Sequence, residues 1–146
     1  MPTRTARTAW NGGLNDGSGQ VELSSSKVGT YDVSFPKRAA DEAGGTTSPE
    51  ELIAAAHSAC YAMQFSAILG EAGGTVEALD VKADVSLGPD SAGGFKLTGI
   101  VLTVNGEVSG IDEAAFHKAA DEAKATCPVS KALTGVDIEL KATFEQ

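Results

Sequence analysis

Apolar and polar positions alternate along several segments of the chain, which predicts strands. Three short apolar runs near the start are separated by clusters of Gly, Asn, Asp and Ser, as is typical of strands joined by turns. They are Ala6–Trp10, Gln20–Ser24 and Tyr31–Phe35. Leu79–Leu87 has an apolar residue at every odd position and a polar one at every even position, which predicts a half-buried strand. In the strand predicted over Phe95–Val108, the apolar phase changes near Gly99, where we expect a β-bulge.

A long helix is predicted to follow the third strand. Ser48 suits the N-cap, Pro49 suits the first helical position, and Glu51 has the spacing of a capping box. The apolar run continues to Leu69, so the helix should end at Gly70 or at Gly73–Gly74.

A second helix and a last strand are predicted near the end of the chain. Asp112 can cap a helix whose apolar stripe ends close to Cys127. The stripe consists of Phe116, Ala119, Ala120 and Ala123. Pro128 begins a short helix through Leu133, and Val136–Phe144 alternates as a strand.

The order of these elements, β-β-β-α-β-β-α-β, indicates an α+β fold with a largely antiparallel sheet. A chain of 146 residues suits one domain, so we expect a single domain over residues 1–146. Pro36–Ser48 holds Pro, Gly, Thr and charged residues and is predicted to be a surface loop. Loops of this length in a compact domain are often functional.

Leu52–Leu69 contains no charged residue and approaches the length of a membrane-spanning helix. The segment is only mildly apolar and is flanked by acidic rather than basic residues, which argues against a span. A helix that is apolar around most of its circumference is otherwise buried. A small domain cannot easily bury such a helix on all sides, so we expect a tight homo-oligomer.

The composition excludes several classes of function. Eleven Lys and Arg against twenty Asp and Glu give a net charge of −9. This acidic balance disfavours binding to nucleic acid or to an anionic membrane. Two cysteines are too few for a disulfide framework, and Met1–Trp10 lacks the apolar stretch of a signal peptide. We therefore expect a soluble protein of a reducing cytoplasm.

The two thiols, Cys60 and Cys127, are the strongest candidates for chemistry. Cys60 lies deep in the long predicted helix, where a buried cysteine often acts only as a small apolar residue. Cys127 precedes Pro128 at a helix N-cap, where free backbone N–H groups lower a thiol pKa. Local rules therefore make Cys127 the better thiolate. The 66 residues between the two thiols do not prevent contact in space.

Other uses of these residues are less well supported. His57 and Cys60 share one helix face and point the same way, which is poor geometry for a cysteine protease pair. A zinc site from His57, Cys60, His117 and Cys127 matches no standard spacing. There is no C-x-x-C motif for thioredoxin-type chemistry, and no glycine-rich phosphate loop follows a strand.

Two motifs resemble those of a known family. They are T-S-P-E-E-L-I-A-A-A-H-S-A-C over Thr47–Cys60 and C-P-V-S-K-A-L over Cys127–Leu133. Supporting marks are Trp10–Gly13, Phe35–Arg38 and Gly110–Asp112. Together they resemble the OsmC/Ohr peroxidases, over nearly the whole chain. His57 in the A-A-H-x-x-C run favours the osmotically inducible OsmC branch over the Ohr branch.

The resemblance implies an OsmC-like α+β fold with a long buried central helix in an intertwined homodimer. It implies thiol-dependent reduction of organic hydroperoxides, and more weakly of hydrogen peroxide, without a metal, prosthetic group or other cofactor. Cys60 would be the peroxidatic thiolate and Cys127 the resolving thiol, while Arg38 and Glu50 would orient and activate Cys60. An external dithiol would reduce the disulfide, and dihydrolipoyl groups are the reductant implied for Ohr-type members.

Helix geometry adds a constraint on Glu50. Ten residues separate it from Cys60, which corresponds to about 15 Å of axial rise. Either the partner subunit supplies Glu50, or the helix breaks. The residues considered for an apolar substrate pocket are Ile53, His57, Met63, Phe65 and Phe116, which otherwise belong to the core. The alternative function is a non-enzymatic dimer of this fold that binds a small apolar ligand.

Overall fold

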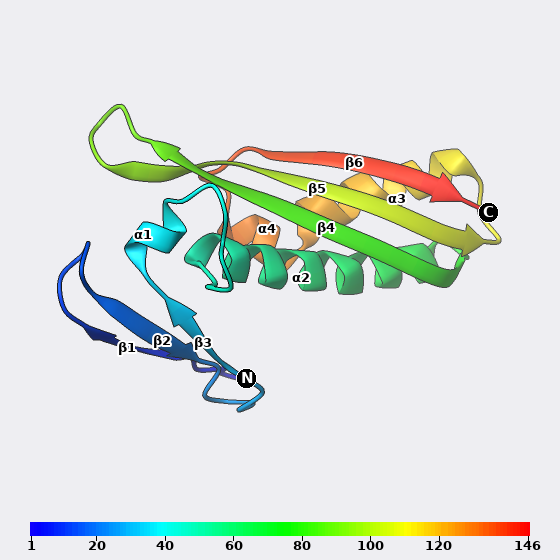
Figure 1. Ribbon diagram of the computed structural model, residues 1–146. Coiled ribbons are helices and arrows are strands. Elements are labelled where there is room, and N and C mark those ends of the chain that lie inside the picture. The colour runs from blue at the N-terminus through cyan, green and yellow to red at the C-terminus, as the bar shows by residue number, and fades with distance from the viewer. The chain divides into compact units, whose positions relative to one another are not determined.

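The computed structural model describes all residues, 1–146, and the chain forms two compact units (Figure 1). The first unit spans Met1–Leu52 and the second Ile53–Gln146. Each unit contains one three-stranded sheet, so the fold is mixed α+β as expected, with two small sheets instead of one. The single domain over residues 1–146 stays a prediction.

The first unit is an antiparallel sheet followed by a short helix. Its strands pair in chain order. They are β1 (Arg7–Asn11), β2 (Ser18–Glu22) and β3 (Thr30–Val33). Helix α1 (Phe35–Arg38) lies where the sequence predicted the end of the third strand and the start of the loop over Pro36–Ser48. The helix signals were local: the Ser34 hydroxyl caps the Lys37 N–H at 3.3 Å, and Pro36 suits the first turn.

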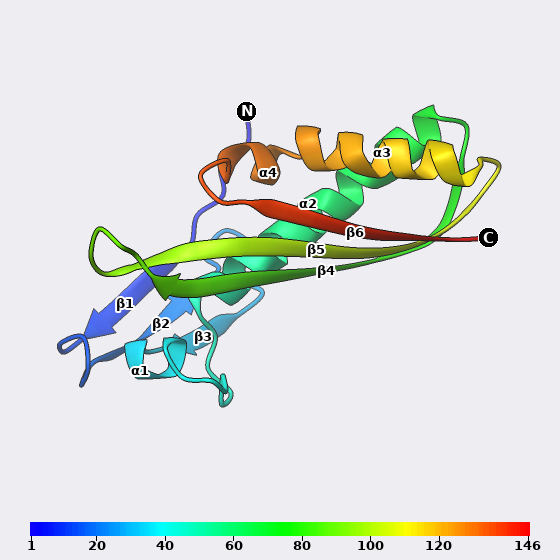
Figure 2. The same cartoon turned by 90° about the horizontal axis from the view of Figure 1, so that it is seen from above.

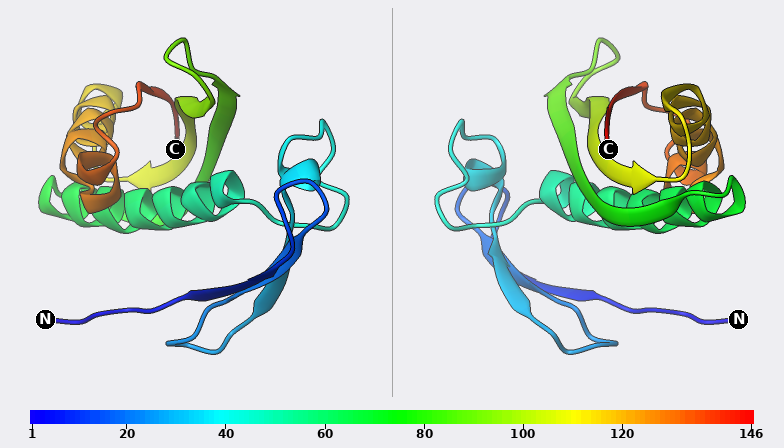
Figure 3. Two further views of the ribbon diagram at one scale, coloured as in Figure 1. Left: turned by 90° about the vertical axis from the view of Figure 1, so that its left-hand side faces the viewer. Right: turned by 90° about the vertical axis from the view of Figure 1, so that its right-hand side faces the viewer.

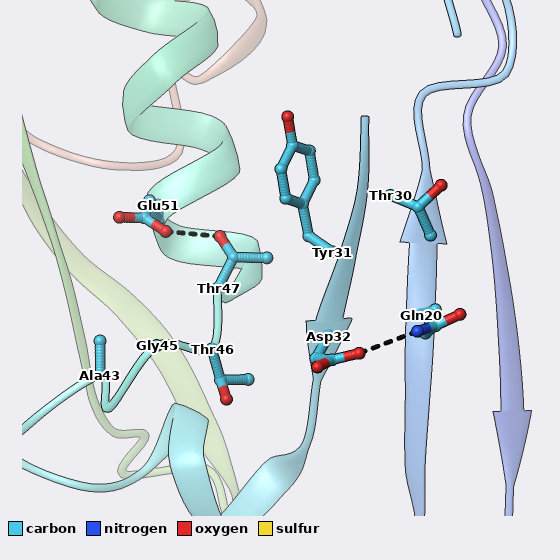
Figure 4. A pocket seen from close by; sticks show the side chains of 9 residues that line it. All are labelled: Gln20, Thr30, Tyr31, Asp32, Ala43, Gly45, Thr46, Thr47 and Glu51. Carbon is cyan, nitrogen blue, oxygen red and sulfur yellow. Dashed lines mark hydrogen bonds between the residues drawn. The ribbon is translucent and has the colours of Figure 1, made fainter. Parts of the chain in front are cut away.

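Helix α2 (Pro49–Glu71) begins in the first unit and continues into the second without a break. The Glu51 N–H donates to the Ser48 hydroxyl at 3.1 Å, which confirms the predicted N-cap. The predicted capping box is only half formed, because the Glu51 carboxylate accepts from the Thr47 hydroxyl at 2.5 Å (Figure 4). The Thr47 N–H also donates to the carbonyl of Asp32 on β3, at 3.1 Å. Thr47 therefore anchors the start of α2 to the first sheet.

The sheet of the second unit contains two long strands and one shorter strand, in the order β4-β5-β6. They are β4 (Thr75–Pro89), β5 (Phe95–Ser109) and β6 (Ile138–Glu145). The register shifts between the pairs Ser86–Gly99 and Leu87–Leu97, which confirms the predicted bulge. β4 and β5 are antiparallel, whereas β6 lies parallel to β5. A parallel neighbour requires a crossover connection, which the intervening helices supply.

Helices α3 (Glu113–Thr126) and α4 (Pro128–Ala132) form this connection. The Asp112 carboxylate accepts from the Ala115 N–H at 2.8 Å, as predicted for the N-cap. The four predicted stripe residues are the buried residues of α3. Figure 2 shows α3 running along β6, so this stripe faces the second sheet.

The core of the second unit lies between α2, α3 and one face of β5. In Figure 3 the curved sheet has both helices against one side. The ring of Phe65 packs edge-on against Phe116, with centroids 5.2 Å apart. The buried residues that form this core are Tyr61, Phe65, Ile68, Leu69, Leu102, Val104, Val108, Phe116, Ala119, Ala120 and Ala123.

Helix α2 is not buried on all sides within the chain. It buries one stripe that includes His57, Tyr61 and Phe65, and leaves the opposite face exposed. By length and composition α2 could cross a membrane, a test that the core helix of a soluble protein also passes. Its exposed face is mostly apolar: it contains Ser66 besides Ala55, Ala56, Ala59, Met63 and Ala67.

Candidate functional site

The two thiols meet in the second unit. The Sγ atoms of Cys60 and Cys127 lie 2.8 Å apart, and both cysteines are free. Cys127 is fully buried, whereas Cys60 is half-buried. A disulfide bond is about 2.05 Å long, so only a small movement would join the sulfurs.

Local structure explains why these sulfurs converge. Cys127 ends α3 and begins α4, because Pro128 has no N–H and cannot continue the first helix. The Cys127 N–H donates to the Ala123 carbonyl at 2.9 Å, and its own carbonyl accepts from Lys131 at 3.0 Å. These bonds fix the cysteine in the turn between two helices. Cys60 lies next to the buried stripe of α2, one residue before Tyr61.

The surroundings of the two sulfurs favour Cys127 as the thiolate. Burial raises the pKa of Cys60, and the neighbouring Cys127 adds to this rise. Burial also acts to raise the pKa of Cys127, but the neighbouring Cys60 thiol, the N–H and hydroxyl of Ser130, and the Val129 N–H outweigh it and lower the pKa. The Val129 N–H acts to lower the pKa of Cys60 but does not offset this rise. This agrees with the prediction from local rules that Cys127 is the better thiolate.

Arg38 and Glu50 form a bidentate ion pair in the first unit. The Arg38 Nη2 lies 2.7 Å from the Glu50 Oε1, and its Nε lies 3.0 and 3.2 Å from the two carboxylate oxygens. Arg38 is the last residue of α1, and Glu50 lies in the first turn of α2. The fork geometry holds the guanidinium in one orientation. Because α2 is unbroken between Glu50 and Cys60, the predicted alternative of a helix break is wrong.

His57 makes a contact that the sequence did not predict. It is fully buried, and its Nε2 lies 2.7 Å from the hydroxyl of Ser130. The opposite nitrogen, Nδ1, has no partner. Burial lowers the pKa of His57, which keeps the imidazole neutral near pH 7. His57 therefore bonds to a serine beside Cys127.

The other residues considered for a substrate pocket lie in different environments. Phe65 and Phe116 are fully buried in the core, Ile53 is half-buried, and Met63 is exposed. Their role in a pocket stays a prediction. No group of three or more His, Cys, Asp or Glu side chains is arranged to hold a metal ion, and His117 instead pairs with Glu113 at 3.5 Å.

The first unit contains an apolar hollow that sequence reasoning missed. Its volume is about 290 Å³, and Arg38 lies in its wall. The apolar residues that line it include Trp10, Leu14, Val21, Val33, Phe35 and Leu52. The only signal was the alternation of apolar residues along short strands, because these residues are far apart in sequence. A second hollow, of about 460 Å³, is lined mainly by polar groups, among them Thr47 and Glu51 (Figure 4).

Solved structures with this fold include organic hydroperoxide resistance proteins. One, from Elizabethkingia anophelis, is 26% identical with a TM-score of 0.79 and covers 99% of this chain and 98% of its own. Another, OhrB of Bacillus subtilis, is 29% identical with a TM-score of 0.74, over 95% of this chain and 98% of its own.

The sequence comparisons identify the family. The model of the family described as OsmC-like protein matches residues 41–141. Peroxiredoxin OsmC of Escherichia coli is 42% identical over 136 residues, which are 91% of this chain and 93% of the relative. An organic hydroperoxide resistance protein of Xanthomonas axonopodis is 32% identical, over 81% of this chain and 82% of the relative. The chain belongs to the family of OsmC-like proteins.

Proposed function

We propose that this chain is a thiol peroxidase that reduces organic hydroperoxides, and more weakly hydrogen peroxide. The observation that carries the proposal is the 2.8 Å separation of the Cys60 and Cys127 sulfurs. The names of the relatives, peroxiredoxin OsmC and organic hydroperoxide resistance protein, support the same reaction class.

The proposed cycle has three balanced steps. The Cys60 thiolate attacks one peroxide oxygen, the O–O bond breaks, and the alkoxide takes a proton and leaves as an alcohol. Cys60 is thereby oxidised to a sulfenic acid. The Cys127 thiolate then attacks the Cys60 sulfur, and hydroxide leaves and takes up a proton to become water. An external dithiol reduces the resulting disulfide by thiol–disulfide exchange, and we propose a protein-bound dihydrolipoyl group as one candidate.

Arg38 and Glu50 are proposed to activate the peroxidatic thiol. Burial alone raises the pKa of Cys60, so a cation must offset this effect to hold a thiolate at neutral pH. Arg38 is a guanidinium whose orientation is fixed by Glu50 and which borders an apolar hollow. The hollow would hold the apolar part of a hydroperoxide near the cation.

A homodimer is proposed as the active form. Along one unbroken helix, Glu50 cannot reach the Cys60 of its own chain, so the partner subunit would supply the ion pair. The apolar face of α2 supports this assembly, because an exposed apolar patch is typical of an interaction surface. We propose that the dimer is soluble and cytoplasmic, and that residues 1–146 act as one domain within it.

A titration of free thiols tests the reaction. One equivalent of cumene hydroperoxide should remove two free thiols per chain, and reduction by a dithiol should restore both. C127S should complete one turnover and accumulate sulfenic or sulfinic acid on Cys60. C60S should consume no peroxide. Unchanged free thiols in the parent protein would overturn the proposal, and peroxide consumption by C60S would reverse the two roles.

The second candidate is a non-enzymatic dimer that binds a small apolar ligand, which the hollow beside Arg38 favours. Binding of a fluorescent apolar probe by C60S and by the parent protein would test it. If the probe binds while peroxide leaves the thiols of the parent protein unchanged, this second function is supported and the peroxidase is not.

A further inference from the structure

Two pairs of side chains face each other across the thiol site. On α2, His57 and Cys60 are three residues apart and therefore share one helix face. Around the first turn of α4, Cys127 and Ser130 have the same spacing. The sulfurs lie 2.8 Å apart, and the His57 Nε2 lies 2.7 Å from the Ser130 Oγ. The histidine–serine contact thus lies one helical turn from the reacting sulfurs.

Burial and hydrogen bonding determine where the proton of His57 resides. A neutral imidazole carries one N–H donor and one bare acceptor nitrogen. Nδ1 is buried without a partner, and Nε2 contacts Ser130. We assign the proton to Nε2, because the only donor of the ring then has an acceptor. The Nε2–H donates to the Ser130 oxygen, so the hydroxyl hydrogen of Ser130 is free for another acceptor.

The sulfur of Cys127 is a candidate for that acceptor, because Ser130 lies three residues after it around the first turn of α4 and both residues are buried. The Ser130 side chain also acts to lower the pKa of the Cys127 thiol. We propose that His57 and Ser130 form a relay of hydrogen bonds that directs the serine hydroxyl at Cys127 and holds this resolving thiol ready as a thiolate. The inference rests on the proposed function, because it assigns the relay to the second step of the cycle.

The relay would act on disulfide formation. In this step the S–O bond of the Cys60 sulfenic acid breaks, and the new bond joins the Cys127 and Cys60 sulfurs. The hydroxide that leaves takes up a proton and becomes water, so no further oxidant or reductant is needed. In the proposed relay, the Ser130 hydroxyl faces the attacking sulfur. His57 is a positioning residue, because it acts only through Ser130.

The neighbouring titratable groups do not replace this relay. Cys60 is the reaction partner itself. The Tyr61 hydroxyl donates to the Ala120 carbonyl at 2.9 Å, and burial, with Asp121 and Cys127, raises its pKa so that it stays neutral. The groups that favour a Cys127 thiolate are the Cys60 side chain, the N–H and the hydroxyl of Ser130, and the Val129 N–H. Removal of the serine hydroxyl therefore deletes one of few donors.

A titration of Cys127 in C60S tests the relay without any peroxidase activity. Thiolate absorbance near 240 nm would be followed against pH in C60S and in three double variants that combine C60S with S130A, H57L or H57Q. S130A and H57L should each raise the Cys127 pKa by about one unit. H57Q should stay near C60S alone, because the glutamine amide can place an N–H close to the position of Nε2. S58A is the matched control, since its hydroxyl bonds to the Ala55 carbonyl of its own helix.

The outcomes separate this inference from the proposed function. If the Cys127 pKa in C60S is the same with and without S130A or H57L, the relay is overturned. Circular dichroism would confirm that each variant is folded. In the chain with both thiols, S130A and H57L should form the disulfide at least several-fold more slowly than the parent protein. They should also accumulate more sulfinic acid on Cys60. If the thiols of the parent protein do not react with peroxide, the proposed peroxidase function is overturned. The pKa titration of Cys127 would still decide whether the relay exists.

Discussion

At the scale of single residues, the acidity of the two thiols does not follow their proposed order of action. The groups around the sulfurs lower the pKa of Cys127 and raise that of Cys60, although Cys60 is proposed to attack the peroxide first. A cation brought to Cys60 resolves this conflict, because its charge favours the thiolate. Arg38, held in a bidentate pair with Glu50, is the proposed source of that charge.

Substitution of Arg38 tests this source. R38M should raise the Cys60 pKa in a C127S background and lower the rate of Cys60 oxidation about tenfold or more. R38K keeps the charge but loses the bidentate fork, so it should fall between R38M and the parent protein. Stopped-flow oxidation by cumene hydroperoxide would measure the rates. Equal rates for R38M in the C127S background and for C127S alone would contradict a role for Arg38.

The burial of His57 predicts that the stability of the chain depends on pH. Burial lowers its pKa in the folded chain, so the unfolded chain binds more protons as the pH falls below about 6.5. The free energy of unfolding should therefore decrease through this window in the parent protein. H57Q lacks this buried imidazole, so its curve should be flatter. Urea unfolding between pH 7.5 and 5 would measure both, and parallel curves would refute the prediction.

At the scale of elements, the close approach of β5 and α3 depends on Gly106. A Cβ at this position would lie 2.5 Å from the Phe116 ring, inside the packed core. G106A should reduce the free energy of unfolding by about 1–3 kcal/mol, because the ring or the strand must move. G70A is the control: a Cβ there meets nothing within 4 Å, and alanine favours a helix. Chemical denaturation would show whether G106A alone is destabilised.

The elements themselves were largely predictable, because each has a local signal. Alternation predicted β4, and the change of phase at Gly99 predicted the bulge in β5. Asp112 and Ser48 predicted two helix starts through their capping hydrogen bonds. Pairing between strands was less predictable. The parallel contact of β5 with β6 and the division into two sheets depend on residues distant in sequence, for which alternation carries no information.

At the scale of the whole molecule, the sequence identified the thiols but not their full surroundings. The two cysteine motifs pointed to Cys60 and Cys127, and the structure brings their sulfurs together. The bond from His57 to Ser130 joins α2 to α4 and follows from tertiary packing alone. The hollow beside Arg38 likewise collects residues from separate strands, none of which carries a chemical motif. Local patterns therefore predict reactive residues better than the groups that position them.

The proposed homodimer can be tested through the division of labour between subunits. If the partner supplies Arg38 and Glu50, then C60S should be inactive alone and R38M should keep about a tenth of the parent activity or less. The two variants should complement each other in mixed dimers. In such a dimer one site combines Cys60 from the R38M chain with Arg38 from the C60S chain. The second site lacks both groups.

Co-expression of the two variants with different affinity tags would yield the mixed dimers. Random pairing in equal amounts gives half mixed dimers with one working site each, or about a quarter of the parent activity. Purification through both tags should raise this to about half, since every dimer is then mixed. If each chain instead used its own Arg38, every Cys60 in the mixture would lie beside a substituted arginine. Activity no higher than that of R38M alone would therefore refute the shared site.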